Sequence, residues 1–272
     1  MCSGSFNFTL VGGPCYNMKE INDLISDIYS YGDLLICANK GIGKTNTLMV
    51  LARKLRENLN NKVIIMEDFP NWCLHFDKIP YIIVRDETVE ETKGNYGQKE
   101  YIVNGEEKFI ELVENNKDIL FTMEISDIER SAYFIYSIVK HFYRKQYIRK
   151  YRNFNTKQRI IFIIEEAQNI YEPSNTNKRV FNRLRKIFTV ARNLNIHFIM
   201  ATQRLQDIST KIRGRSRLLI GQISIDDWEL KIRRLLRHSK YNKQMLILEK
   251  GKFLYPYTDE IISFPLFNIR EE

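Results

Sequence analysis

The chain has 272 residues, of which 44% are hydrophobic, and this is enough to build one domain with a sizeable core. Its 42 Lys and Arg residues outnumber the 33 Asp and Glu residues, and the net charge of +9 favours a polyanionic partner. The apolar runs are too short to span a bilayer, the N-terminus lacks the pattern of a signal peptide, and the four cysteines lack metal-ligand spacing. These features exclude a membrane-spanning protein, a disulfide scaffold and a zinc site, and they predict a cytoplasmic protein.

Short apolar runs alternate with longer segments of helical period along the chain. The predicted strands cover residues 33–37, 62–66, 81–84, 119–123, 159–164, 196–201 and 218–223. The predicted helices cover residues 45–58, 109–114, 128–151, 180–193 and 226–238. Residues 92–97 are predicted to form an exposed loop because they combine glycines with polar side chains. This alternation predicts an α/β fold in which helices cover both faces of a mainly parallel sheet.

The domain organisation follows from the absence of any repeat, low-complexity tract or Pro/Gly/Ser-rich linker in the sequence. We therefore predict a single domain over residues 1–272. Residues 1–32 would form an N-terminal extension, residues 33–238 the core, and residues 239–272 a C-terminal hairpin and tail.

The first predicted strand leads into a segment that nearly matches the phosphate-binding pattern G-x-x-x-x-G-K-[ST], with Ala38 where the first glycine usually stands. In such a loop, backbone N–H groups and a helix N-terminus converge on phosphate, the lysine reaches the β- and γ-phosphates, and the hydroxyl binds Mg²⁺. Alanine is small enough to replace the glycine in the turn. The residues predicted to bind ATP are Asn39, Lys40, Gly41, Ile42, Gly43, Lys44, Thr45 and Asn46.

Two further predicted strands end in polar side chains suited to nucleotide hydrolysis. Residues 159–164 are followed by Glu165, predicted to hold Mg²⁺ together with Thr45, and by Glu166, predicted to activate the attacking water. Residues 196–201 lead to Gln203, whose amide is suited to sensing the γ-phosphate or positioning that water. If these strands are neighbours, all three sets of side chains meet at their carboxyl ends, where open α/β sheets bind ligands.

Residues 41–45, 163–168 and 191–204 together resemble the HerA/FtsK superfamily of P-loop ATPases. This superfamily includes chromosome translocases, DNA-end-processing motors and viral genome-packaging ATPases. The last of these stretches is the most specific, because an Arg-bearing helix leading into a strand that ends Ala-Thr-Gln-Arg is typical of the group. Residues 248–264 are similar to the closing hairpin of the family. The departures are Ala38 for Gly, Glu165 for Asp, and Gln168 where many members have His.

The resemblance implies a RecA-like (ASCE) core that forms a ring, usually a hexamer, around DNA, with ATP between subunits. An arginine from the neighbouring subunit would complete hydrolysis, and Arg192 is the first candidate. Arg204 is the next candidate, followed by three arginines near the last core strand: Arg213, Arg215 and Arg217. The short segment before the core favours a minimal motor of the packaging type, from a virus or mobile element. Such a motor would have a capsid or portal-like protein as a further partner.

Residues 140–159 carry eight Lys or Arg, five aromatic residues and no acid. Such a segment can contact phosphates and bases without reading sequence. The residues predicted to bind DNA are Arg144, Lys145, Arg149, Lys150 and Arg152. The alternative is an amphipathic helix with a solvated cationic face, whose tyrosines pack into the core. The helical spacing of Tyr143, Tyr147 and Tyr151 favours this alternative.

The motifs favour ATP hydrolysis coupled to movement of duplex DNA over two related functions. One alternative is a dimeric partitioning-type switch, but Lys40 lies four residues before Lys44 rather than five, and such switches lack an equivalent of Glu166. The other is a helicase-loader-like adaptor, whose loop Asn39 matches but whose strands lack an equivalent of Gln203. A basic DNA-binding protein without enzymatic activity would need neither Lys44 nor Glu166.

Overall fold

The computed structural model describes residues 18–67, 79–85, 90–93, 99–103, 105–124, 128–152, 158–168, 178–224 and 244–265. The predicted helix 226–238 lies outside the described residues, as does the first half of the N-terminal extension. All strands of the described part join one sheet.

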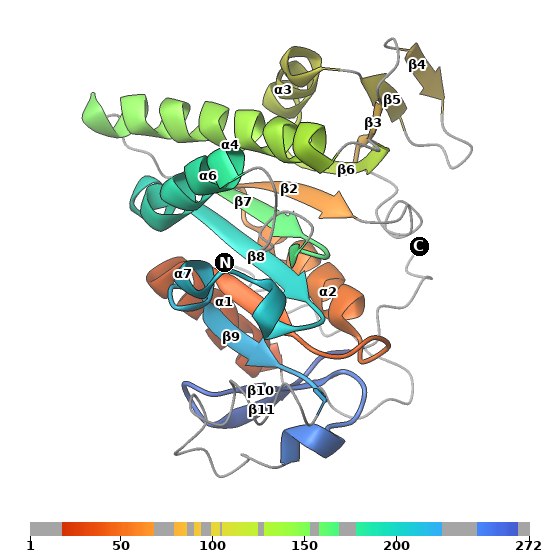
Figure 1. The fold of residues 1–272 in the computed structure, drawn as a ribbon, viewed down its shortest axis with the longest axis vertical. Coiled ribbons are helices and arrows are strands. Elements are labelled where there is room, and N and C mark those ends of the chain that lie inside the picture. The colour runs from red at the N-terminus through yellow and green to blue at the C-terminus, as the bar shows by residue number, and fades with distance from the viewer. Residues whose placement is uncertain are drawn as a thin grey trace, which may run out of the picture.

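The elements follow one another in alternation, as the hydrophobic pattern predicts (Figure 1). The strands are β1 (Leu34–Cys37), β2 (Asn61–Glu67), β3 (Tyr81–Arg85), β4 (Glu90–Lys93), β5 (Lys99–Val103), β6 (Ile119–Glu124), β7 (Arg159–Ile164), β8 (Ile196–Thr202), β9 (Arg217–Ile220), β10 (Lys252–Tyr255) and β11 (Glu260–Ser263). The α-helices are α1 (Met18–Tyr31), α2 (Lys44–Glu57), α3 (Glu106–Asn115), α4 (Ile128–Tyr151), α6 (Lys178–Ala191) and α7 (Thr210–Arg213). Short 3₁₀ turns are η2 (Arg192–Leu194), η3 (Leu205–Asp207) and η5 (Gln244–Ile247).

The sheet has the strand order β11-β10-β9-β1-β8-β7-β2-β6-β3-β5-β4. Pairing is parallel from β9 through to β5, whereas β4, β10 and β11 pair antiparallel with their neighbours. Strand β8 separates β1 from β7, and its Ile199 is the register partner of both Leu34 and Ile163. The residues that follow β1, β8 and β7 therefore emerge side by side at one edge of the sheet.

Helices cover both faces of the sheet and enclose two hydrophobic cores (Figure 1). The alternation of a strand sends successive side chains to opposite faces, so Leu35 of β1 packs into one core and Leu34 into the other. The core beneath α3, α4 and α6 includes Phe142 and Phe188. The core beneath α1 and α2 includes Ile28. Because both faces are covered, the central strands are buried and read as continuous apolar runs.

Most predicted elements are confirmed, and the differences lie at the ends of the sheet. Residues 92–93 belong to strand β4, which pairs with β5, so the prediction of a loop from 92 to 97 is wrong at its start. Helix α1 occupies the second half of the predicted N-terminal extension and buries Ile21 and Leu24 against the sheet. The C-terminal hairpin is confirmed as β10 and β11, paired from Lys252 with Ser263 onward.

The parallel strands give the molecule two functional edges. The ends of β1, β7, β8 and β9 where these strands finish are called the carboxyl edge, and the opposite ends the amino edge. In Figure 1 the carboxyl edge lies to the right and the amino edge to the left. Among the described helices, none combines the length and hydropathy that a bilayer span requires.

Candidate active site

The predicted phosphate loop joins β1 to α2 at the carboxyl edge. Gly41 has φ 83° and Gly43 has φ 103°, values in the left-handed region that glycine adopts without steric cost. Helix α2 begins immediately afterwards at Lys44, and the N–H of Thr47 donates to the carbonyl of Gly43 (2.9 Å). The loop thus directs a helix N-terminus, with its unpaired N–H groups, toward the space where a phosphate would bind.

The Lys44 side chain lies against the loop that precedes it. Its Nζ donates to the carbonyl oxygens of Ala38 (2.9 Å) and Asn39 (3.2 Å), and only 8% of the residue is exposed. Burial lowers the pKa of Lys44, while the nearby carboxylates of Glu166 and Glu165 oppose this change. A lysine held here can place its positive charge on a phosphate group while it interacts with both acids.

Ala38, the departure from the usual glycine, is accommodated by a glycine on another strand. A Cβ added to Gly221, just after β9, would lie 2.8 Å from the Cβ of Ala38 and 2.9 Å from the ring of Phe253. The N–H of Gly221 donates to the carbonyl of Cys37 (2.9 Å), so the two segments are in direct backbone contact. The missing side chain at position 221 makes room for the methyl group at position 38.

The two predicted metal ligands lie together at the carboxyl edge. The hydroxyl of Thr45 donates to Oε1 of Glu165, and the N–H of Glu165 donates to the carbonyl of Met66 (3.0 Å) on β2. One hydroxyl and one carboxylate form a donor set that suits Mg²⁺, which usually keeps several waters and completes its shell with phosphate oxygens. The extra methylene of Glu165 compared with Asp does not prevent it from reaching Thr45.

Glu166 is fixed in place by its backbone and by two amides. It has φ 51°, which is uncommon for a residue with a side chain and indicates a tightly specified position. Its Oε1 accepts from Nε2 of Gln203 (3.2 Å), and its Oε2 accepts from Nε2 of Gln168. The next residue ties the two strand ends together, because the N–H of Ala167 donates to the carbonyl of Ala201 (2.8 Å).

The strand order explains why these side chains meet. Gln203 follows β8, and β8 lies between the phosphate-loop strand β1 and the acidic strand β7. The amide of Gln203 is therefore placed between the loop and Glu166. The structure brings together five of the predicted site residues at the carboxyl edge: Lys44, Thr45, Glu165, Glu166 and Gln203.

The C-terminal hairpin supports the phosphate loop from the other side. The N–H of Gly251, at the start of the hairpin, donates to the carbonyl of Ile42 (2.9 Å). Nδ2 of Asn46 donates to the carbonyl of Pro265 (2.7 Å), just after the hairpin. Lys40 is exposed at the tip of the loop. The prediction that Asn46 contacts the nucleotide thus remains untested, and its observed contact is structural.

The structure separates the candidate arginines into two groups. Arg204 follows Gln203 at the carboxyl edge and is exposed. Arg192 lies before β8 at the amino edge, and seven strand residues at roughly 3.3 Å each place it about 20 Å from that site. Its Nη1 donates to the carbonyl of Tyr31 (2.6 Å). Arg192 therefore lies too far from the phosphate loop of its own chain to contact a nucleotide bound there.

Two of the remaining candidate arginines, Arg215 and Arg217, make contacts at the amino edge. The guanidinium of Arg217 lies 4.0 Å from the ring centre of Tyr31 and 3.9 Å from that of Tyr257. Nη1 of Arg215 donates to the carbonyl of Thr189 (2.7 Å). Arg213 is half-buried on α7, and its burial lowers the pKa of its guanidinium.

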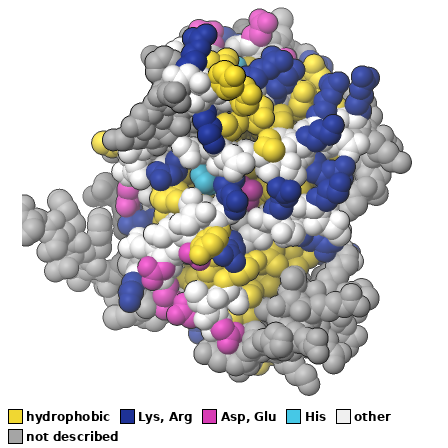
Figure 2. Space-filling model, turned by 90° about the vertical axis from the view of Figure 1, so that its left-hand side faces the viewer, with side chains coloured by type: hydrophobic (Ala, Val, Ile, Leu, Met, Phe, Trp, Pro, Cys, Tyr) yellow, Lys and Arg dark blue, Asp and Glu magenta, His cyan; other side chains and the backbone are white. Residues whose placement is uncertain are grey.

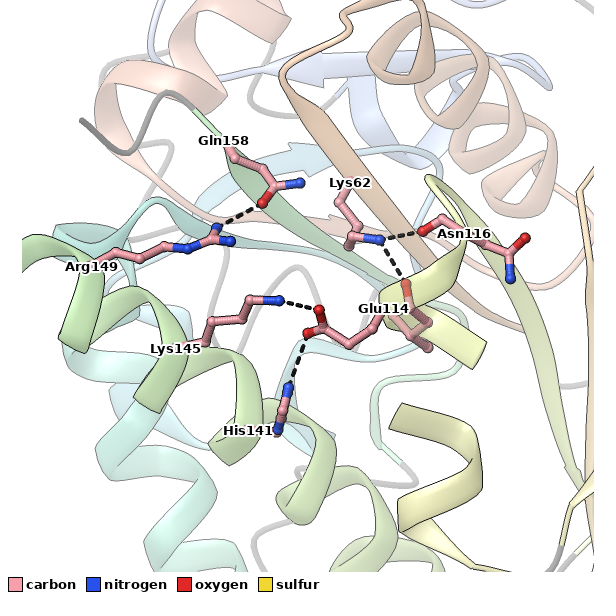
Figure 3. A network of polar contacts seen from close by, with 8 residues as sticks. Lys62, Glu114, Asn116, His141, Lys145, Arg149 and Gln158 are labelled. Atoms are coloured by element: carbon pink, nitrogen blue, oxygen red, sulfur yellow. Dashed lines mark hydrogen bonds and ion pairs between the residues drawn. The ribbon is translucent and has the colours of Figure 1, made fainter. Parts of the chain in front are cut away.

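Two of the five residues predicted to bind DNA are engaged inside the protein (Figure 3). Lys145 forms an ion pair with Glu114, which also accepts from Nε2 of His141 (3.0 Å). Although burial opposes it, hydrogen bonds from Lys145 and His141 hold the pKa of Glu114 below its ordinary value. Nη1 of Arg149 donates to Oε1 of Gln158 (2.9 Å). These contacts join α4 to α3 and to the start of β7.

The other three predicted DNA-binding residues are exposed: Arg144 and Lys150 on the same helix, and Arg152 directly after it. Of the three tyrosines that recur at helical spacing, Tyr143 packs partly buried against the core, as the alternative expects, whereas Tyr147 and Tyr151 lie outside it. Tyr147 is 49% exposed and Tyr151 is 79% exposed.

Sequence reasoning missed three residues that shape the site. Gln168 was noted only as a departure from a family pattern, but its amide holds Glu166. Gly221 and Gly251 lie far from the loop in sequence and contact it in space. The signal available for Gln168 was its position two residues after Glu166. Nothing in the sequence connects either glycine with the loop.

No family model and no curated protein sequence matches the chain. Solved structures match it in fold. The genome packaging NTPase B204 from Sulfolobus turreted icosahedral virus 2, in complex with AMP, gives a TM-score of 0.54 at 10% identity, over 85% of this chain and 95% of that chain. VirB4 of Thermoanaerobacter pseudethanolicus gives a TM-score of 0.55 at 12% identity, over 86% and 88%.

A third similar structure is EccC (ATPases 2 and 3) of Thermomonospora curvata, with a TM-score of 0.51 at 12% identity, over 90% of this chain and 38% of that chain. The structural neighbours thus comprise a viral genome-packaging NTPase and ATPases of the FtsK/HerA type. The chain has the RecA-like P-loop NTPase fold that the sequence predicts.

Proposed function

We propose that this chain is an ATP-hydrolysing motor that moves double-stranded DNA as a ring of identical subunits, most simply a hexamer. The observation that carries the proposal is the arrangement around Glu166. This carboxylate is held by the amides of Gln203 and Gln168 at the carboxyl edge, beside the phosphate loop. An acid fixed in this position is suited to orient water and accept its proton. A protein that only bound nucleotide would not require such an acid.

Each of the other residues has a role in this proposal. The backbone of residues 39–46 and the start of α2 bind the phosphates, and Lys44 exchanges its bonds to loop carbonyls for bonds to phosphate oxygens. Thr45 and Glu165 would hold Mg²⁺, which when bound neutralises charge on the β- and γ-phosphates. Gln203 lies between the γ-phosphate position and Glu166. Loss of the γ-phosphate on hydrolysis would therefore change the contacts of Gln203 at the end of β8.

The coupling to DNA is supported by the net charge of +9 and by the genome-packaging function of one fold neighbour. That neighbour is B204, a genome packaging NTPase, and VirB4 and EccC share its fold. We therefore favour the genome of a virus or mobile element as cargo. A capsid or portal-like protein would then be a further partner, and the motor would work in the cytoplasm or on the virion.

The test is phosphate release from ATP with and without duplex DNA, for wild type and Glu166→Gln. We expect DNA to stimulate the wild type, and Glu166→Gln to lose roughly 10²- to 10⁴-fold in kcat while still binding ATP. Glu111→Gln is the matched control, because Glu111 is an exposed carboxylate on α3 that pairs only with Lys108 among the described residues. A mass measurement with an ATP analogue should give a ring.

The alternative is a nucleotide switch of the partitioning or helicase-loader type, acting as an adaptor on a DNA complex. It would form a dimer or bind a protein partner, and its turnover would not respond to DNA. A strictly dimeric protein, or ATP hydrolysis that is the same with and without DNA, would contradict the motor and favour this switch.

A further inference from the structure

Three adjoining hollows form a continuous trough at the amino edge, on the side of the molecule away from the phosphate loop. The first, of about 500 Å³, lies between the ends of α4 and α6, and the second, of about 330 Å³, lies beside η2. Both are lined by Asn193. The third, of about 730 Å³, lies between α6 and α7 and shares Thr189 and Arg215 with the second. We call this feature the amino-edge trough.

One end of the trough has an aromatic wall. The rings of Tyr143 and Tyr147 stack with centres 6.2 Å apart, and those of Tyr147 and Tyr151 with centres 6.1 Å apart, at 19° between planes in both pairs. This spacing matches the rise of four residues along a helix. The ladder lines the first hollow with Val190, which is 40% exposed. Two exposed tyrosines and a half-exposed valine around one hollow are apolar surface that a ligand can cover.

The rest of the trough is cationic. Six of its lining side chains are Lys150, Arg185, Lys186, Arg192, Lys211 and Arg215. Four of them are held by neutral carbonyl groups: Nζ of Lys150 donates to Asn193 (2.8 Å), Arg192 to Tyr31, Arg215 to Thr189, and Arg185 to the side-chain amide of Asn182. In the part of the chain that the structure describes, none of the six forms an ion pair with a carboxylate. Their positive charge therefore remains available to a ligand.

The trough contains little opposing charge. The one carboxylate among its lining residues is Asp33, which is 4% exposed and accepts from the N–H of Phe198 (2.8 Å). Figure 2 shows this face of the molecule, where Lys and Arg side chains gather across the middle and upper parts beside hydrophobic side chains. A polyanion lying along the trough would meet cations over most of its length.

We infer that the amino-edge trough binds a single strand of nucleic acid, with phosphates on the cations and bases against the tyrosine ladder. A cationic groove with aromatic side chains is the arrangement that binds unpaired strands without sequence preference, since every base has a face that can stack. A duplex keeps its bases inside and would leave the tyrosine rings uncovered. An acidic peptide would satisfy the cations and make no use of the ladder.

This inference goes beyond the proposed function, which concerns movement of duplex DNA and depends on the opposite edge of the molecule. The test is the binding of a fluorescent oligothymidylate of about 15 nucleotides, followed by anisotropy between about 50 and 200 mM salt. We expect the double variant Tyr147→Ala/Tyr151→Ala to weaken binding by roughly 10- to 100-fold. The variant Tyr147→Phe/Tyr151→Phe keeps the rings and should bind within about threefold of wild type.

The controls distinguish the effect of the tyrosine ladder from the effects of losing any exposed tyrosine or any positive charge. Tyr133→Ala removes a tyrosine that is 48% exposed near the other end of α4, and it should leave the affinity unchanged. Lys186→Glu/Lys211→Glu reverses two exposed charges of the trough, and it should weaken binding and flatten its dependence on salt. Lys19→Ala, at an exposed position of α1, should have neither effect.

Three results would overturn the inference. The first is an affinity of Tyr147→Ala/Tyr151→Ala equal to that of Tyr133→Ala. The second is full competition by polyglutamate with no effect of the ladder variants. The third is a ladder variant that changes the mass of the assembly and leaves strand binding intact, because the ladder would then contact a second copy of the chain. Failure of duplex DNA to stimulate ATP hydrolysis would contradict the proposed motor and would not affect this binding measurement.

Discussion

At the scale of single residues, the phosphate loop depends on a glycine 183 positions away from Ala38 in the sequence. Because a Cβ at position 221 would lie within 3 Å of Ala38 and Phe253, Gly221→Ala must displace the loop or the hairpin. We expect it to lower the free energy of unfolding by about 1–3 kcal/mol and to weaken ATP binding. Chemical denaturation and nucleotide titration would measure both.

The double variant Ala38→Gly/Gly221→Ala provides the check on this account. It removes the closest of the clashes, although Phe253 remains near the new methyl group. We therefore expect partial recovery of both stability and ATP affinity. Strict additivity of the two substitutions in a double-mutant cycle would show that positions 38 and 221 do not interact.

Also at the residue scale, His197 on β8 gives the fold a dependence on pH. It is 2% exposed, and burial together with the charges of Arg159 and Arg192 lowers its pKa from 6.5 to about 4. As pH falls below 6.5, the unfolded chain takes up a proton at His197 that the folded chain does not. Between pH 6.5 and 4 the folded state should therefore lose about 3 kcal/mol through this residue.

The measurement is the free energy of unfolding of wild type and His197→Leu at about pH 4.5, 5.5 and 7.5. The difference between the two proteins isolates His197, because burial raises the pKa of Asp33 to about 7 and gives wild type an opposing slope over the same range. The variant should gain relative stability as pH falls. A difference that stays constant with pH would contradict the assignment.

At the scale of elements, the C-terminal hairpin acts as a support for the phosphate loop. Gly251 has φ 80°, and its N–H donates to the carbonyl of Ile42. An alanine there would be strained by about 1–2 kcal/mol in this conformation, and its Cβ would lie 3.3 Å from the carbonyl of Phe264. We expect Gly251→Ala to lower both the melting temperature and the affinity for ATP.

Gly105→Ala is the matched control for this substitution. Gly105 precedes α3 with φ −148°, and a Cβ there would meet nothing within 4 Å. It should leave ATP affinity unchanged. Equal effects of Gly251→Ala and Gly105→Ala on ATP affinity would show that the hairpin does not support the phosphate loop.

The elements themselves were largely predictable, because the period of apolar residues survives in the sequence. Helix α1 was not predicted, although Ile21, Leu24 and Ile28 recur at helical spacing and are buried in the core beneath it. The spaced tyrosines of α4 show what helical periodicity cannot predict. Their spacing reveals a shared face, but what packs against α4 decides whether that face is buried.

The site was predictable where its residues follow strands and was not where contacts join distant segments. Glu166 and Gln203 could be paired because both follow buried strands, and their contact confirms the expected neighbourhood of β7 and β8. The contacts of Gly221 with Ala38 and of Gly251 with Ile42 depend on the sheet order. No local pattern in one sequence encodes that order.

At the scale of the whole molecule, Arg192 tests whether subunits share active sites. It lies at the amino edge, about 20 Å by strand length from Glu166 on the same chain. If it acts on a neighbour, Arg192→Ala should lower kcat by roughly 10³-fold or more. Mixing the Arg192→Ala protein with the Glu166→Gln protein should restore part of the ATPase activity. At some interfaces of a mixed ring, one subunit supplies an intact Glu166 and its neighbour supplies an intact Arg192.

The outcome that would contradict this role is a loss of stability with no recovery on mixing. Arg192 donates to the carbonyl of Tyr31 and packs where Gly32 has no side chain, so a purely structural role predicts that result. Arg204→Ala, at the carboxyl edge, is the comparison. It should not be complemented in the same way if it serves its own chain.

The position of the amino-edge trough at the opposite end of β8 from the phosphate loop has a thermodynamic consequence. A nucleotide and a nucleic acid strand bound to the same chain would not compete for space, so any influence of one on the other within that chain must pass through the sheet as a coupling free energy. Such coupling is reciprocal: the factor by which ATP changes the affinity for the strand equals the factor by which the strand changes the affinity for ATP. Two titrations measured independently must therefore agree, and a factor of one in both would mean that the two edges work separately.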